Sequence, residues 1–98
     1  MAQFIASARR NYDDFPEAAF TAELLEAEAE RVRTLHRDGV FRQVWGRGDS
    51  PGAVIVIESA SLDEARAALD TLPLQQRGML VIDALIPVTA YRGFGPRG

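Results

Sequence analysis

The chain has 98 residues, of which 47% are hydrophobic, and it carries 11 basic and 14 acidic residues, a net charge of −3 and no cysteine. This size and composition predict one globular domain with a modest core. Disulfides and thiolate metal sites are excluded, and one histidine leaves too few ligands for a typical zinc site, so we expect no metal. The charges of both signs are interspersed, whereas nucleic acid requires a concentrated basic surface. We therefore expect no nucleic-acid partner.

No apolar run approaches the roughly 18 residues needed to cross a bilayer. The first residues lack a basic region ahead of an apolar core, so no secretory signal is expected, and we predict a cytoplasmic location without a membrane partner. All basic residues other than His36 are arginine. Schiff-base chemistry is therefore excluded, and an anionic ligand must be held by guanidinium groups or by the backbone.

The first half of the chain reads as strand, helix and strand. A strand is predicted over 3–10, and Pro16 suits the first position of a helix that runs to Asp38. Gly39 stands where a left-handed residue ends a helix. A second strand is expected over 40–45, and the glycine-rich segment 46–52 predicts a hairpin loop.

The second half repeats this order. The β-branched run 53–57 predicts a third strand, and Ser61 with Glu64 forms the pattern of a capping box for a second helix. Pro73 is expected to end that helix before a fourth strand over 79–86. Strand–helix–strand given twice predicts an α+β chain of the ferredoxin-like type, βαββαβ, with a four-stranded antiparallel sheet and both helices on one face. Residues 1–88 would form this domain.

The third and fourth strands lack the alternation that a sheet with one wet face should show. Both faces of these strands are therefore expected to be covered, although the two helices can cover only one. A second copy of the chain is the simplest cover, which predicts a face-to-face homodimer. The alternative to a dimer is that these apolar runs are too short to be informative and that one face of the sheet is partly hydrated. The glycine-rich tail, 89–98, is either a frayed terminus or an arm that closes the pocket of a neighbouring subunit.

Glu28 is the main candidate for chemistry. At about 100° per residue, it falls near the middle of the apolar stripe of the first helix, whereas Glu26 and Glu30 fall on the outer face. Burial raises the pKa of a carboxyl group and makes it a useful proton shuttle near neutrality. The alternative is an ion pair with Arg31 or Arg42 that keeps Glu28 charged and inert.

The spacing of Leu35, Gly39, Arg42 and Trp45, followed by Leu-Pro-Leu at 72–74, resembles muconolactone delta-isomerase, an enzyme of bacterial aromatic-acid breakdown. The resemblance covers about 4–87. It implies a dimeric α/β barrel, often built into a larger ring of dimers, and no cofactor, because the substrate carbonyl itself delocalises charge. It also places Glu28 on a family glutamate that is thought to transfer the proton. Two departures from the family pattern lie at Ile5, where a histidine is usual, and at 75–77.

The resemblance implies further roles at the second strand. A muconolactone carries a carboxylate, which Arg42 would hold with two parallel hydrogen bonds, and Trp45 would form a pocket wall against the lactone ring. The alternatives are a solvent-facing arginine and a tryptophan of the core. Strand alternation puts the two side chains on opposite faces unless a bulge intervenes.

The leading hypothesis is thus a cofactor-independent isomerase-like enzyme that moves a proton on a small carboxylated lactone in aromatic-compound catabolism. Glu28 would be catalytic, and Arg42 and Trp45 would bind substrate. A cofactor-free monooxygenase or cyclase of the same fold and a non-catalytic small-molecule-binding module are the alternatives, because one fold carries many functions.

Overall fold

The computed structural model describes residues 1–95 as an α+β chain in which all three strand pairs are antiparallel. Its sheet has the strand order β2-β3-β1-β4. The elements are β1 (Ala2–Arg10), the 3-10 helix η1 (Glu17–Ala19), α1 (Ala22–Arg37), β2 (Phe41–Gly46), β3 (Gly52–Ser59), α2 (Leu62–Leu69), α3 (Pro73–Gln76), β4 (Leu80–Val88) and η2 (Arg92–Phe94).

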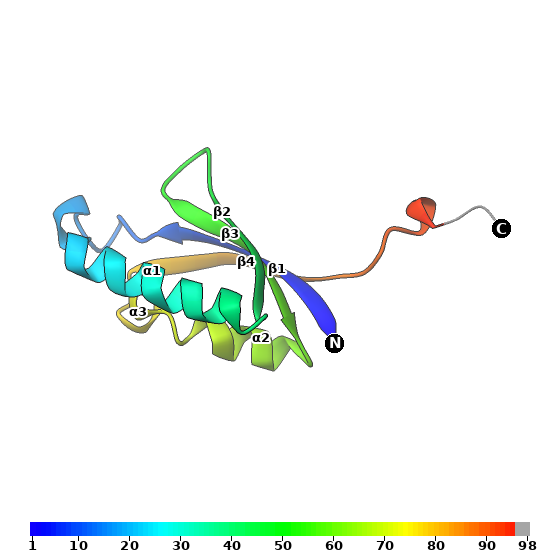
Figure 1. Ribbon diagram of the computed structural model, residues 1–98. Coiled ribbons are helices and arrows are strands. Elements are labelled where there is room, and N and C mark those ends of the chain that lie inside the picture. The colour runs from blue at the N-terminus through cyan, green and yellow to red at the C-terminus, as the bar shows by residue number, and fades with distance from the viewer. Residues whose placement is uncertain (96–98) are drawn as a thin grey trace.

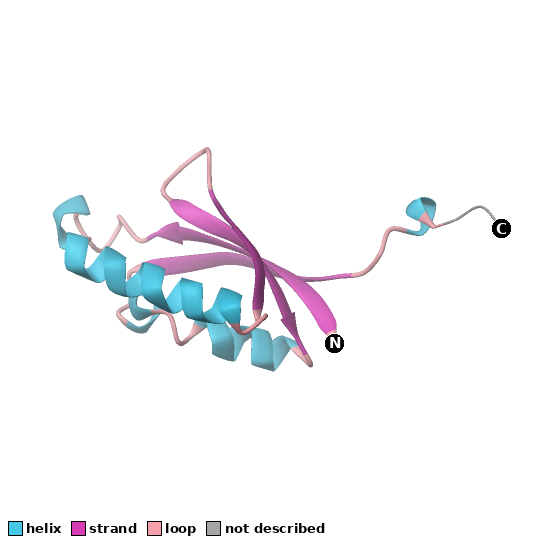
Figure 2. Ribbon diagram, viewed as in Figure 1, coloured by secondary structure: helices cyan, strands magenta, loops and turns pink. Residues whose placement is uncertain are grey.

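The helices α1, α2 and α3 lie on one face of the twisted sheet (Figures 1 and 2). The expected α+β class and four-stranded antiparallel sheet are confirmed, and the element order is compatible with the ferredoxin-like arrangement. The short α3 is an addition to the two helices that were expected. No helix within residues 1–95 is both long and apolar enough to span a membrane.

The start of the first helix was predicted wrongly. Pro16 has an extended backbone and precedes η1 instead of opening α1. Thr21 is the N-cap of α1, and its side chain accepts a hydrogen bond from the Leu24 amide at 3.2 Å. A threonine that satisfies a free amide of the first turn is a strong start signal, so the long helix begins only at Ala22. At the other end Gly39 has a φ of 81°, as expected of a left-handed stop.

The role of Pro73 was also predicted wrongly. The capping box of α2 is present, because Ser61 accepts from the Glu64 amide at 3.1 Å and the Glu64 carboxylate accepts from the Ala60 amide at 3.1 Å. That helix ends at Leu69, well before the proline, and Pro73 opens α3. Proline suits a first helical position because its missing N–H would have no helical partner there. This short helix delivers the amide of Leu74 to the site described below.

The core lies between the helices and one face of the sheet. Alternate residues of β1 (Phe4, Ala6 and Ala8) are buried against the helical layer, as are Ile55 and Ile57 of β3. All of these except Ala8 pack in one cluster with Leu35 of α1 and Leu69 of α2. At the end of the β1–β3 pair the backbones come so close that a Cβ on Gly52 would lie 2.1 Å from the Ala8 carbonyl oxygen.

No part of residues 1–95 forms a second layer over the other face of the sheet (Figure 2). This open face carries Ile5, Val54 and Val56, which alternate with the buried residues of their strands. Trp45 and Ile86 are 50% and 51% exposed. Because those strands are apolar on both sides, the chain leaves a hydrophobic sheet surface uncovered.

After β4 the chain leaves the sheet and extends away from the rest of the structure (Figure 1). Tyr91 and Phe94 in this arm are 71% and 88% exposed, and their rings stack edge to face with centroids 5.4 Å apart. The last part of the predicted tail, 96–98, lies outside the described residues.

Candidate functional site

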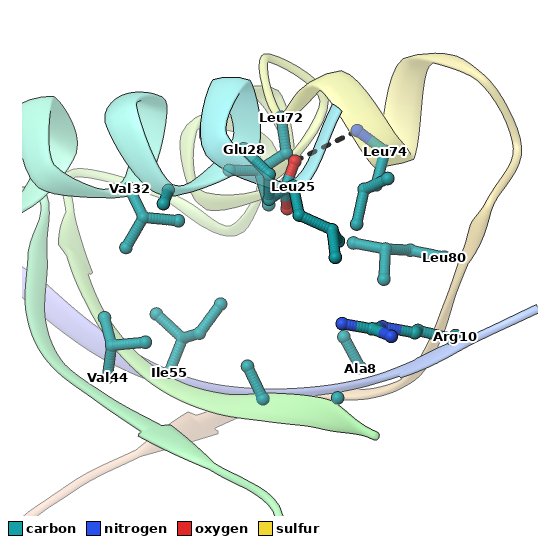
Figure 3. Close-up of a pocket in the computed structure, with 13 residues that line it drawn as sticks. Ala8, Arg10, Leu25, Glu28, Val32, Val44, Ile55, Leu72, Leu74 and Leu80 are labelled. Atoms are coloured by element: carbon teal, nitrogen blue, oxygen red, sulfur yellow. Dashed lines mark hydrogen bonds between the residues drawn. The ribbon is translucent and has the colours of Figure 1, made fainter. Parts of the chain in front are cut away.

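A cavity of about 250 Å³ lies between α1 and the sheet. Its walls come from α1, α3 and all four strands, with Leu72 from the segment between α2 and α3, and they are almost entirely aliphatic (Figure 3). Two charged side chains interrupt this lining: Glu28 from α1 and Arg10 from the end of β1. The cavity lies against the core, so Glu28 is an acidic residue on a face of α1 that otherwise packs.

Glu28 occupies the position that the helical wheel predicts. Its side chain is half-buried and turns toward the sheet, whereas Glu26 and Glu30 are exposed and pair with Arg33. The amide of Leu74 donates a hydrogen bond to Oε1 of Glu28 at 3.0 Å (Figure 3). This amide belongs to the first turn of α3, where no residue of the helix itself can accept from it. The carboxyl group therefore fixes α3 and is itself oriented by it.

Burial raises the pKa of Glu28 because the charged form loses hydration, and the hydrogen bond from Leu74 opposes this effect without cancelling it. The ion-pair alternative is not formed. Arg31 donates instead to Oγ1 of Thr71 at 2.9 Å, and Arg42 is exposed and does not line the cavity. Within residues 1–95, Glu28 forms no salt bridge. The Glu28 carboxyl group therefore holds its proton to a higher pH than an exposed glutamate does.

The structure does not bring the other two predicted site residues to this cavity. Strand β2 has a bulge between Phe41 and Gln43, the irregularity that the sequence left open. Beyond it, Trp45 pairs with Val54 on the open face of the sheet. Arg42 and Trp45 thus lie outside the cavity that holds Glu28, and their predicted roles in binding substrate would need the second subunit.

Arg10 was not predicted as a residue of the site. Strand alternation was the available signal, because Phe4, Ala6 and Ala8 point to the helices and the same period places Arg10 on that face. An arginine at the end of a buried strand face is unusual, since charged residues are seldom buried without a partner. Figure 3 shows its guanidinium turned into the cavity beneath Glu28.

The positions that depart from the family pattern lie away from this cavity. Ile5 pairs with Val56 and Ile86 on the open face, and the segment 75–77 at the end of α3 does not contribute to the lining. Neither departure therefore lines the cavity within one chain. His36 is exposed, and its Nδ1 lies 2.8 Å from the Phe41 carbonyl oxygen.

A polar cluster that was not predicted from the sequence lies on the open face of the sheet. Arg47 from the β2–β3 loop makes two hydrogen bonds to Asp49, at 2.9 and 2.7 Å, and reaches Asp83 of β4 at 2.9 Å. It also approaches Oγ of Ser7 at 3.3 Å. These bonds lower the pKa of Asp49 to about 2 and that of Asp83 below its ordinary value. Because its acids are paired with a guanidinium, this cluster holds the loop against the sheet.

Within residues 1–95 no group of three or more histidine or acidic side chains is arranged to hold a metal ion. The sequence matches no model of a known protein family, and no curated protein is significantly similar to it.

Proposed function

We propose that this chain is a cofactor-independent isomerase-like enzyme that moves a proton on a small carboxylated lactone of the muconolactone type, in the breakdown of aromatic compounds. The observation that carries the proposal is the Glu28 carboxyl group: it is half-buried, it faces an aliphatic cavity, and it lacks an arginine partner within the described residues. The resemblance of the sequence to the isomerase family supplies the reaction class.

In the proposed reaction, the Glu28 carboxylate removes a proton from the ring carbon that is conjugated with the lactone carbonyl through the ring C=C bond. The electron pair of the broken C–H bond moves through that C=C bond into the carbonyl, and the same carboxyl group returns the proton to the carbon next to the carbonyl on the same face, so that the double bond shifts by one position. Oε1 is held by the Leu74 amide, whereas Oε2 has no hydrogen bond within residues 1–95 and is free to act. General acid–base action of this kind typically contributes about 10²–10⁴-fold, and positioning contributes more.

Substitution of Glu28 by Gln tests this role. The amide side chain keeps an acceptor for Leu74 but cannot shuttle a proton, so muconolactone isomerisation should fall by about 10²–10⁴-fold. Glu26→Gln is the matched control, because Glu26 is a solvent-exposed acid on the outer face of the same helix, and its rate should stay near wild type. A near wild-type rate for Glu28→Gln would remove this residue from the mechanism.

We propose further that a second copy of the chain covers the open face, as a dimeric α/β barrel or a ring of such dimers. The support is the apolar surface around Ile5, Val54 and Val56, with Trp45 and Ile86 half-exposed at its sides. Burial of such a surface against its own copy is the commonest closed arrangement. In the dimer, Trp45 on the open face would lie against the partner subunit, where it would form the pocket wall predicted for it.

Light scattering of the purified protein tests the assembly. The wild type should have the mass of a dimer or a multiple of it. Trp45→Glu should shift the mass toward the monomer, because a charge would be buried without a partner. Leu62→Glu, at an exposed position on α2, should leave the mass unchanged. A monomeric wild type, or a Trp45→Glu variant with unchanged mass, would refute the arrangement.

A non-catalytic small-molecule-binding module is the second candidate, and one observation favours it. The hydrogen bond from the Leu74 amide gives Glu28 a purely structural role as the cap of α3. This role would account for a glutamate at this position in a protein without catalytic activity. Binding of a lactone by the wild type without isomerisation, together with lower stability of Glu28→Ala than of Glu28→Gln, would support this function over the enzyme.

A further inference from the structure

Arg10 is the second charged group in the wall of the cavity, and it has no acidic partner within residues 1–95. Its side chain makes one hydrogen bond among these residues, from Nη1 to the hydroxyl of Tyr12 at 3.2 Å. A guanidinium has five N–H donors, so most of its donors remain free. Arg10 is half-buried in an aliphatic lining, yet it lacks the carboxylate partner that charges in such positions usually have.

The structure holds this guanidinium in place. The Arg10 backbone N–H donates to the Pro51 carbonyl at 3.1 Å, which anchors the end of β1. Its guanidinium carbon lies 5.2 Å from the ring centroid of Phe20, and the Tyr12 ring packs edge to face on the same phenylalanine at 5.3 Å. Aromatic contacts of this type orient an arginine without using its in-plane donors. The free donors are thus presented in a fixed direction at one end of the cavity (Figure 3).

We propose that Arg10 binds the carboxylate of the substrate, and that the site takes small organic acids with a compact apolar body. This inference rests on the proposed function for the position of the reacting atoms. A carboxylate matches the planar fork of a guanidinium with two parallel hydrogen bonds. The aliphatic walls, including Leu25, Val32 and Ile55, suit the hydrocarbon part of a ring. A volume of about 250 Å³ is smaller than the roughly 300–1,000 Å³ of sites for drug-sized ligands, so the ligand is small.

The arrangement of charges also orients the ligand. Glu28 and Arg10 enter the cavity from opposite layers, the first from the helix and the second from the sheet. A ligand carboxylate next to Glu28 would be repelled by it when ionised, whereas next to Arg10 it gains an opposite charge. The ring carbons of an anchored acid then face Glu28. Arg10 thereby takes the carboxylate-binding role that was predicted for Arg42.

Binding of simple model acids tests this assignment without requiring turnover. Cyclopentanecarboxylate is titrated into the ¹⁵N-labelled full chain and followed by amide chemical shifts, with neutral cyclopentanecarboxamide as the matched ligand. We expect the wild type to prefer the carboxylate and Arg10→Gln to bind it about 10- to 100-fold more weakly, with little change for the amide. Arg9→Gln is the matched control variant, because Arg9 precedes Arg10 in the same strand but pairs with Val81 on the open face. It should bind like the wild type.

Arg10→Lys provides a second variant if Arg10→Gln does not fold. It keeps the charge but loses the planar fork, and its affinity should lie between those of the wild type and an uncharged variant. Equal affinity of wild type, Arg10→Lys and Arg10→Gln for the carboxylate would overturn the inference. So would a wild type without preference for carboxylate over amide, or a loss of affinity on Arg42→Gln alone.

The outcome is separable from that of the proposed function. Loss of carboxylate binding in Arg10→Gln together with wild-type isomerisation by Glu28→Gln would support the anion site and refute proton transfer. Unchanged binding in Arg10→Gln together with loss of turnover in Glu28→Gln would do the opposite.

Discussion

Substitution of Gly52 by Ala should disrupt the edge of the cavity at the point where β1 and β3 come closest. The added Cβ would lie 2.1 Å from the Ala8 carbonyl oxygen and 2.9 Å from the Arg9 Cα. Real Cβ atoms do not approach so closely, and both neighbours are backbone atoms that cannot rotate away. The two strands must therefore separate by about 1 Å, which is enough to break hydrogen bonds of the ladder.

The expected loss follows from these contacts. Overpacking of a tightly packed site typically costs about 1–3 kcal/mol, and each lost backbone hydrogen bond adds about 1 kcal/mol. The bonds at risk include those from the Arg10 amide to Pro51 and from the Arg47 amide to Gly52, both 3.1 Å long. We expect a decrease of about 2–4 kcal/mol in the free energy of unfolding and of roughly 8–30 °C in Tm.

Thermal and urea denaturation followed by circular dichroism measures this loss. Gly48→Ala is the control, because no atom lies within 4 Å of its added Cβ and its backbone does not require glycine. That variant should be unchanged or up to about 1 kcal/mol more stable, since alanine restricts the unfolded chain. A Gly52→Ala protein as stable as the wild type would show that the strand pair tolerates separation and that the close approach does not constrain the cavity.

Three further measurements follow from the structure. Because burial raises the pKa of Glu28 above its ordinary value of 4.5, the stability that this group contributes at low pH is lost as the pH rises through the higher folded-state pKa. Urea unfolding from pH 4 to 8 should therefore show Glu28→Gln gaining stability relative to the wild type, and a constant difference would contradict the raised pKa. Leu69→Ala, at a fully buried position, should lose about 2–5 kcal/mol, whereas Leu62→Ala at a 42% exposed position should lose far less; similar losses would refute the packing. Replacement of Arg47 by Met should raise the pKa of Asp49 from about 2 toward 3.8 in a carboxyl NMR titration, and an unmoved pKa would exclude the pair.

Local signals predicted most of the architecture. Gly39 ends α1 in the left-handed region, and Ser61 with Glu64 caps α2, because each depends only on neighbours within a few residues. The two errors involve proline. Pro16 and Pro73 both fit a helix start or stop by local rules, and the choice depended on Thr21 in one case and on the packing of α3 in the other.

The site was only partly predictable, for a similar reason. The helical period placed Glu28 on the inner face of α1, but its partner Leu74 is 46 residues away and is brought there by the turn that begins at Pro73. Arg10 follows the alternation of β1, but the tertiary structure is needed to place it in the same cavity as Glu28. Arg47 lies in a predicted loop, where no periodicity indicates a partner such as Asp83.

The amino-acid sequence by itself determined the class of fold, the order of its main elements and the position of Glu28 on the inner face of α1. These features follow from the spacing of apolar residues, which repeats every 3.6 residues in a helix and every 2 in a strand. The tertiary structure decided that Glu28 accepts a hydrogen bond from a backbone amide and does not pair with an arginine. It also decided that Arg10 lines the same cavity and that Arg42 and Trp45 do not. These are contacts between elements distant in sequence. They depend on the strand register, the bulge in β2 and the packing of α3 against α1, which no local pattern specifies.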